Sequence, residues 1–138
     1  MTQMIKKIRE KKGFTLAELL IVVAIIGVLV AISIPIFTSQ LEKAREATDL
    51  ANIRSAYAEC STAVLTGEAD ADVKPAKDTG AYSKSVEISQ TKADWLDSNK
   101  DVKVAGKAVS TFKWQPKDGA NGSVTVTVNK DGTFDVTQ

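Results

Sequence analysis

Few residues in this chain could carry out chemistry, because its 138 residues include no histidine and a single cysteine, Cys60. Without histidine, one subunit cannot build a Ser-His-Asp or Cys-His nucleophile, nor the usual zinc ligand sets. Asp70 and Asp72 lack the further oxygen ligands of a calcium loop, so we interpret them as part of a solvated loop. We therefore expect no catalytic residue of these kinds, no cofactor and no metal site.

Glu18 is chemically unusual because it borders a long uncharged run. Residues 19–41, 23 in number, carry no charged side chain. At about 1.5 Å per residue they would form roughly 35 Å of helix, enough to cross the hydrocarbon core of a bilayer. A carboxylate deep in lipid costs about 2.5–3.5 kcal/mol. Glu18 therefore needs either a shallow position near headgroup water or a cationic partner, and its own sequence context favours neither.

The flanks of the apolar run predict its orientation and its continuation. Residues 1–13 carry five Lys or Arg and one acid, which places the N-terminus in the cytoplasm and residues beyond about 40 outside. Residues 33–40 lack the small-residue pattern of ordinary signal-peptide cleavage. The chain instead continues as a strong helix former until Gly67, a typical stop signal. We expect one long helix, bent near Pro35 because proline removes a backbone donor.

The sequence KKGFTLAELL at residues 11–20, followed by IVVAIIGVLVAISIP, resembles the class III signal and N-terminal helix of type IV pilins. The resemblance implies that a dedicated prepilin peptidase cuts between Gly13 and Phe14 and methylates the new N-terminal Phe14. It further implies that Glu18 pairs with the Phe14 α-ammonium of a neighbouring subunit and so sets the axial register of assembly. Between Gly27 and Pro35, helices of this family can lose hydrogen bonding in assembled filaments.

The same resemblance implies a division of the chain. Residues 1–13 are a leader, 14–40 a transmembrane and later filament-core helix, 41–66 the amphipathic half of that helix, and 67–138 a globular domain. Loss of the leader removes five positive charges and one negative charge, so the net charge changes from +1 to −3. A chain without net positive charge has no electrostatic footprint for nucleic acid. We expect no nucleic-acid partner, although a DNA-uptake subunit with a local patch at Lys100, Lys103 and Lys107 stays open.

The outer domain is expected to contain a small antiparallel sheet. Strands are predicted at residues 109–115, 123–129 and 133–136, with weaker candidates at 86–89 and 102–105. A hairpin turn is predicted at residues 129–132 and a loop at 67–83. A short helix or turn at residues 91–96 is expected to bury Trp95. About 70 residues are too few for an independent core, so the distal half of the long helix should cover the sheet. The expected fold class is α+β, the type IV pilin fold.

Beyond Pro35 the apolar positions of the helix fall into two stripes. One contains Phe37, Leu41, Ala44, Ala51, Ala58 and Leu65; the other contains Leu50, Ile53, Tyr57, Cys60 and Val64. Two stripes favour one face against the chain's own domain and another against neighbouring subunits, although ordinary core packing with many alanines explains them equally well.

Two further residues have simple interpretations. Cys60 is predicted to be a buried, unreactive thiol; the lack of a cysteine pair resembles the cysteine-poor pilins of Gram-positive bacteria. Asn121-Gly122-Ser123 matches a glycosylation acceptor, but an Asn-Gly turn explains it more simply.

The sequence thus predicts a structural subunit that is inserted in the cytoplasmic membrane as a prepilin. It would then polymerise with copies of itself into a cell-surface filament for adhesion, motility or aggregation. Its expected partners are other subunits, the prepilin peptidase and the membrane platform for pilus assembly. A pseudopilin of a type II secretion system or a competence pilin would share every N-terminal feature. A membrane-anchored binding module that never polymerises is an alternative of another class.

Overall fold

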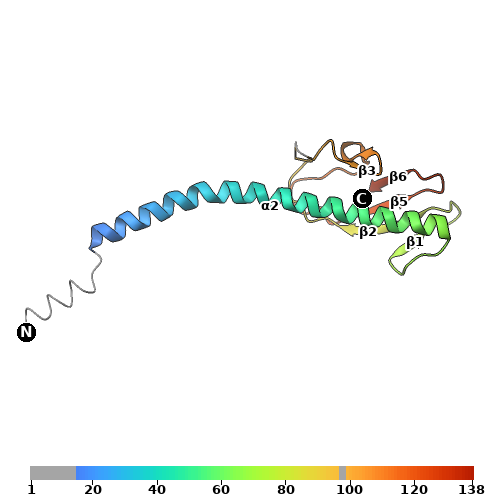
Figure 1. Ribbon diagram of the computed structural model, residues 1–138, viewed down its shortest axis with the longest axis horizontal. Coiled ribbons are helices and arrows are strands. Elements are labelled where there is room, and N and C mark those ends of the chain that lie inside the picture. Colours follow the sequence, from blue (N-terminus) through green and yellow to red (C-terminus); the bar gives the residue numbers. More distant parts are fainter. Residues whose placement is uncertain (1–14, 97–98) are drawn as a thin grey trace, which may run out of the picture. The chain divides into compact units, whose positions relative to one another are not determined.

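The computed structural model describes residues 15–96 and 99–138, which form one long helix and a small antiparallel sheet (Figure 1). The elements are α2 (Leu16–Thr66), β1 (Val73–Pro75), β2 (Tyr82–Glu87), β3 (Lys103–Val104), β4 (Lys107–Ala108), a 3-10 turn η1 (Val109–Thr111), β5 (Ser123–Val128) and β6 (Phe134–Thr137). The chain divides into two units, residues up to Ser39 and residues from Gln40 onward, and each is described by itself.

Helix α2 spans 51 residues and ends where the sequence predicts. Gly67 follows it with a φ of 74°, a left-handed conformation that glycine adopts without steric cost, and its N–H donates to the Ala63 carbonyl at 2.8 Å. Pro35 lies inside the helix. The continuous hydrogen-bonded run on both sides of it confirms a single helix from residue 16 to residue 66.

The main sheet has four antiparallel strands in the order β1-β2-β5-β6. Val124, Val126 and Val128 are buried on alternate positions of β5, as their spacing predicts. The β5–β6 hairpin closes through a bond from Asn129 N–H to the Thr133 carbonyl at 2.8 Å. The predicted turn at residues 129–132 is therefore confirmed.

The core of the outer domain lies between the distal half of α2 and this sheet (Figure 1). The Tyr57 and Phe134 rings lie 4.7 Å apart, and the Cys60 sulfur lies 3.9 Å from the Val126 carbonyl oxygen. The helix contributes Leu50, Ile53, Ala56, Cys60 and Ala63 to this core. The second apolar stripe therefore packs on the chain's own domain, whereas the first stripe from Leu41 to Leu65 is exposed. The α+β fold class is confirmed.

The strand predicted at residues 109–115 is wrong. Residues 107–108 pair with β3, residues 109–111 form η1, and no strand follows before β5 in the described residues. The Gln115 side chain donates to the carbonyls of Val109 and Phe112 at 3.1 and 2.9 Å, so the backbone is satisfied locally rather than by a ladder. Phe112 and Trp114 still enter the core.

Several predicted elements in the first half of the outer domain also differ from the structure. Residues 67–83, expected as a loop, contain β1 and the start of β2. Strand β2 extends well before the weak candidate at residues 86–89. Trp95 is buried, as expected, but residues 92–94 form bends, and neither a helix nor a turn lies within residues 91–96. Residues 103–104, inside the other weak candidate, do form a short strand.

Candidate functional site

Helix α2 begins with a reciprocal pair of hydrogen bonds between Thr15 and Glu18. The Thr15 N–H donates to Glu18 Oε2 at 3.0 Å, and the Glu18 N–H donates to the Thr15 hydroxyl at 3.2 Å. This is a capping box, which satisfies two backbone donors at the helix start. Oε1 of Glu18 has no partner among the described residues. Glu18 therefore stabilises its own helix, and its Oε1 accepts no hydrogen bond from residues 15–96 or 99–138.

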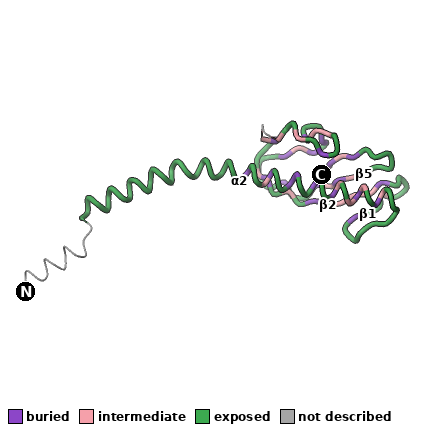
Figure 2. Tube along the Cα trace, viewed as in Figure 1, coloured by how far each residue is buried: buried purple, intermediate pink, exposed green. Residues whose placement is uncertain are grey.

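After the cap, every residue of α2 up to Leu41 is exposed (Figure 2). Sixteen large apolar side chains between Leu16 and Leu41 are each 39–75% exposed. Burying one such side chain stabilises a protein by about 1.5–3 kcal/mol, so exposing all of them to water is unfavourable. The helix is long and apolar enough to cross a membrane, with a mean hydropathy of 3.1 in its most apolar 18-residue window. The segment therefore requires lipid or other protein chains around it.

Two hydroxyl groups of the apolar segment are satisfied within the helix. The Ser33 hydroxyl donates to the Leu29 carbonyl at 2.7 Å, and the Thr38 hydroxyl donates to the Ile34 carbonyl at 2.9 Å. Such back-bonding lets hydroxyl groups enter an apolar environment without external partners. The side chains of Ser33 and Thr38 can thus be surrounded by apolar groups.

Gly27 and Pro35, the two predicted helix-breaking residues, both lie within α2. A methyl group built at Gly27 meets no atom within 4 Å, so nothing in this chain requires glycine there. The predicted cleavage and methylation site, Gly13 and Phe14, lies outside the described residues.

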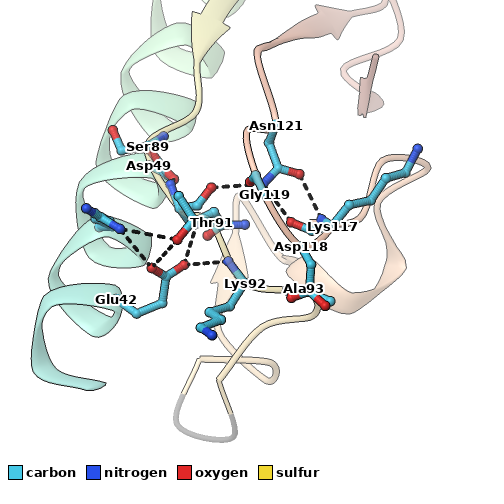
Figure 3. Close-up of polar contacts among 12 residues, drawn as sticks. Glu42, Asp49, Ser89, Thr91, Lys92, Ala93, Lys117, Asp118, Gly119 and Asn121 are labelled. Atoms are coloured by element: carbon cyan, nitrogen blue, oxygen red, sulfur yellow. Dashed lines mark hydrogen bonds and ion pairs between the residues drawn. The ribbon is translucent and has the colours of Figure 1, made fainter. Parts of the chain in front are cut away.

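A second polar site, which the sequence reasoning missed, lies on the buried face of α2. Glu42, Glu46 and Asp49, here called the acidic row, are only 4%, 1% and 0% exposed. They accept hydrogen bonds from residues 88–96, here called the strap, and from Asn99 just beyond it. Figure 3 shows the Glu42 and Asp49 ends of this contact.

The bonds of the acidic row are mostly to backbone N–H groups. Glu42 Oε1 accepts from the N–H groups of Thr91 and Lys92 at 2.6 and 2.9 Å. Asp49 accepts from Ser89 and Gln90, both at 2.8 Å. Residues 88–96 of the strap form no strand. The bonds to Glu42 and Asp49 hold this irregular segment against the helix.

Glu46, between them, binds the far end of the strap. Both of its oxygens lie within 3.2 Å of the Leu96 N–H, and Oε2 also accepts from the Asn99 amide at 2.7 Å. Arg45 lies 3.4 Å from Glu42 and donates to the Thr91 hydroxyl at 3.2 Å. Hydrogen bonds to ionised carboxylates are strong, so the row can offset the cost of burying its charges.

The electrostatics of Glu42 follow from this geometry. Burial by itself raises the pKa of the Glu42 carboxyl, but the N–H groups of Lys92 and Thr91, the Thr91 hydroxyl and Arg45 outweigh it and lower the pKa below its usual value. Elsewhere on the same face, burial raises the pKa of the Cys60 thiol, with a smaller effect from nearby Glu59. Cys60 is thus buried, as its sequence context predicts.

Asn121 has a structural role on the other side of the strap. Its buried side-chain amide donates to the Gln90 carbonyl at 2.8 Å, and its oxygen accepts from the Lys117 N–H at 2.7 Å (Figure 3). Gly122 beside it has a φ of 67°, as expected for an Asn-Gly turn. An amide that is 3% exposed and already bonded favours the turn over the glycosylation acceptor.

One signal for the acidic row is present in the sequence. Glu42, Glu46 and Asp49 recur at a spacing of four and three residues, in line with Leu50 and Ile53 on the buried stripe. Glu42 and Glu46 are a like-charged pair at i,i+4, which is unfavourable on an exposed helix face. A row of acids on an apolar stripe indicates that hydrogen-bond donors from elsewhere in the chain reach these carboxylates.

The chain is similar to several surface-filament proteins. Residues 8–34 match the family described as the prokaryotic N-terminal methylation motif. The chain is 33% identical over 121 residues to the "Type IV narrow pilus major component PilA5" of Thermus thermophilus, covering 86% of this chain and 97% of that protein. It is 31% identical over 131 residues to a "Fimbrial protein" of Pseudomonas aeruginosa, covering 93% and 67%.

A third relative is the "Type IV major pilin protein PilE1" of Neisseria gonorrhoeae, which is 31% identical over 129 residues, covering 83% of this chain and 73% of that protein. No solved structure matches the chain. The relatives match across both the helix and the outer domain, so the likeness is not confined to the N-terminal motif.

Proposed function

The chain belongs to the type IV pilins, the structural subunits of type IV pili, and on that premise we propose that its exposed apolar helix passes from the membrane into the core of a homopolymeric filament. The observation that carries this proposal is the exposure of every residue of α2 from Leu16 to Leu41. A surface this apolar is satisfied by lipid before assembly and by identical helices afterwards.

Processing at the N-terminus would prepare the helix for this transfer. We propose that the prepilin peptidase cuts between Gly13 and Phe14 and that Phe14 is then methylated. The cut removes Lys6, Lys7, Arg9, Lys11 and Lys12, whose charges would oppose extraction through lipid. The freed α-ammonium of Phe14 keeps its positive charge after methylation, so it remains available to a carboxylate.

Glu18 is our proposed partner for that α-ammonium in a neighbouring subunit. Its Oε2 accepts from Thr15 of its own chain, while Oε1 has no partner among the described residues. An ion pair in an apolar bundle is stabilising only if both charges are also hydrogen-bonded, and the capping box provides part of this for Glu18. One pair per subunit would set the axial register of the bundled helices.

The test is the N-terminus and yield of sheared fibres. Filaments sheared from cells should contain a chain that begins with methylated Phe14, and Glu18→Gln should reduce filament yield at least about tenfold, since one buried pair is lost. Glu68→Gln, which neutralises an exposed acid of the outer domain, is the matched control. An intact Met1 in the membrane fraction with no fibres would instead support an anchored module that does not polymerise.

The biological process that the filament serves is a separate proposal. We propose a surface pilus for adhesion, motility or aggregation, because the three relatives are named as pilus or fimbrial proteins. A pseudopilin or competence pilin would share the N-terminal features. Long fibres in the sheared fraction distinguish a pilus from a short secretion pseudopilus. The proposed partners are copies of the chain, the peptidase and the membrane assembly platform, and the proposed role is structural rather than enzymatic.

A further inference from the structure

The strap is attached to α2 through carboxylates in which every oxygen accepts a hydrogen bond. Asp49 Oδ1 and Oδ2 accept from Ser89 and Gln90. Glu42 Oε1 accepts from two backbone N–H groups, and its Oε2 accepts from the Thr91 hydroxyl at 3.1 Å. Both oxygens of Glu46 accept from Leu96. A protonated carboxyl is neutral, and one of its oxygens carries a hydrogen that cannot face an N–H donor, so protonation weakens the bonds between the row and the strap.

The strap also contains a buried group that opposes its docking. Gln90 is 1% exposed, and neither its side-chain oxygen nor its side-chain nitrogen has a hydrogen-bond partner in the described protein. Its backbone is fixed on both sides, because its N–H donates to Asp49 and its carbonyl accepts from Asn121. A buried polar group without a partner is destabilising, and lifting the strap into water would satisfy this amide.

The charged groups around the row come from three elements. On α2 itself they are Lys43, Arg45 and the row's own members. The strap contributes Lys92 and Asp94, with Lys100 shortly after it, and the segment beyond it contributes Lys117 and Asp118. Arg45 lies 3.4 Å from the Glu42 carboxylate. Most of the hydrogen bonds between the strap and α2 join backbone N–H groups to carboxylates of the row.

We propose that residues 88–96 form an acid-released strap: protonation of the acidic row weakens its backbone bonds, and the strap lifts locally from α2, carrying Gln90 into water while the sheet stays folded. The two effects act in the same direction, since acid weakens the attachment and the buried Gln90 amide favours release. A pilus carrying such a strap would present a different outer surface at acidic pH from that at neutral pH.

Hydrogen exchange on the full mature chain in detergent tests this proposal. The amides of Ser89, Gln90 and Leu96 should lose protection at least about tenfold, relative to intrinsic exchange, as the pH falls well below 4.5, the ordinary pKa of the Glu42 carboxyl, because the fold lowers that pKa. The amides of Val126 and Val136 in the core of the sheet should keep theirs. If the strand amides lose protection together with the strap, release is global and the proposal is overturned, as it is if strap protection does not change.

Variants separate the two effects. Asp49→Asn, which puts donor hydrogens where Gln90 or Ser89 now donates, should release the strap at neutral pH, whereas Glu87→Gln, at an exposed acid on β2, should not. Gln90→Leu removes the unpaired amide and should move the release to lower pH. Release at the same pH in Gln90→Leu as in the natural chain, or a closed strap in Asp49→Asn at neutral pH, would contradict the mechanism.

Discussion

The two units of this chain satisfy the same physical requirement in opposite ways. From Leu16 to Ser39 no described side chain is buried, whereas the outer domain encloses a core in which Ile53, Val126 and Val136 are completely inaccessible. The outer domain finds its apolar partners within the chain. The N-terminal unit has none there and must find them in lipid or in other subunits. Substitutions should therefore have separable effects: fold stability in one unit, insertion and assembly in the other.

The two units should differ most in their response to an introduced charge. Val126→Asp puts a carboxylate at a fully buried position of β5 and should destabilise the outer domain by more than about 4 kcal/mol, which unfolds most domains of this size. Thermal unfolding of the mature chain in detergent, followed by circular dichroism of the sheet, measures this. The prepilin should still insert in membranes, because residues 19–41 are unchanged.

Val28→Asp is the matched change in the apolar segment, where Val28 is 60% exposed. It should leave the unfolding temperature of the outer domain unchanged and raise the cost of membrane insertion by about 2.5–3.5 kcal/mol. Loss of the folded domain in this variant would show that the two units depend on each other.

Smaller effects are expected when isoleucine is replaced by alanine at two positions of α2. Ile53→Ala removes a side chain with no exposed surface and should cost about 2–5 kcal/mol of unfolding free energy. Ile25→Ala, at a position that is 55% exposed, should change the stability of the free subunit by less than about 0.5 kcal/mol. Urea unfolding in detergent checks both. Equal effects would mean that Ile25 is packed within the chain after all.

The same contrast explains which features the sequence predicted. The helix was predictable because its signal is local: an uncharged run, a capping residue and Gly67. Strands β5 and β6 were predictable because buried valines alternate with exposed residues around an Asn-Lys-Asp-Gly turn. Strand β2 was only weakly predicted. It lies between β1 and β5, yet Val86 is its only buried residue, so its sequence carries no alternation. Its pairing with β5 depends on backbone bonds, which any sequence can make.

The two candidate sites differ likewise. Glu18 was found because an acid beside an apolar run is conspicuous. Glu42, Glu46 and Asp49 were missed because acids are almost always exposed, and their donors lie 40–53 residues further along the chain. Only the folded chain brings the strap to the helix. The spacing of the three acids on the buried stripe indicates that donors must reach them, but it does not indicate which residues supply those donors.

A smaller effect is expected from acid on the sheet side of the outer domain. Burial raises the pKa of the Asp135 carboxyl, but the N–H groups of Lys113 and Val136 and the Lys107 ammonium, 3.1 Å away, outweigh it and lower the pKa. A carboxyl whose folded pKa is lowered contributes stability above its unfolded value, near 3.8, and that contribution disappears as pH falls through the folded pKa.

Asp135→Asn should therefore lower the unfolding free energy by about 1–2 kcal/mol at neutral pH and by progressively less below roughly pH 3.8. Urea midpoints of the natural chain and the variant, measured against pH, should converge in acid. A difference that stays constant with pH would mean that Asp135 acts through packing rather than charge. Because Asp135 lies on β6 and not on α2, the strap amides should exchange normally in this variant.

The smallest effect on the free subunit is expected for Gly27→Ala, and it is the most informative about assembly. An added methyl group meets no atom within 4 Å, and alanine is favoured over glycine in a helix by about 0.5–1 kcal/mol. The unfolding of the outer domain should not change, and the apolar helix should become slightly more stable. If the helix between Gly27 and Pro35 must open in the filament, that same gain works against assembly, so fibre yield should fall although the subunit is more stable. Normal fibres from this variant would mean that glycine is not required for opening, and that the helix stays continuous from the membrane to the filament.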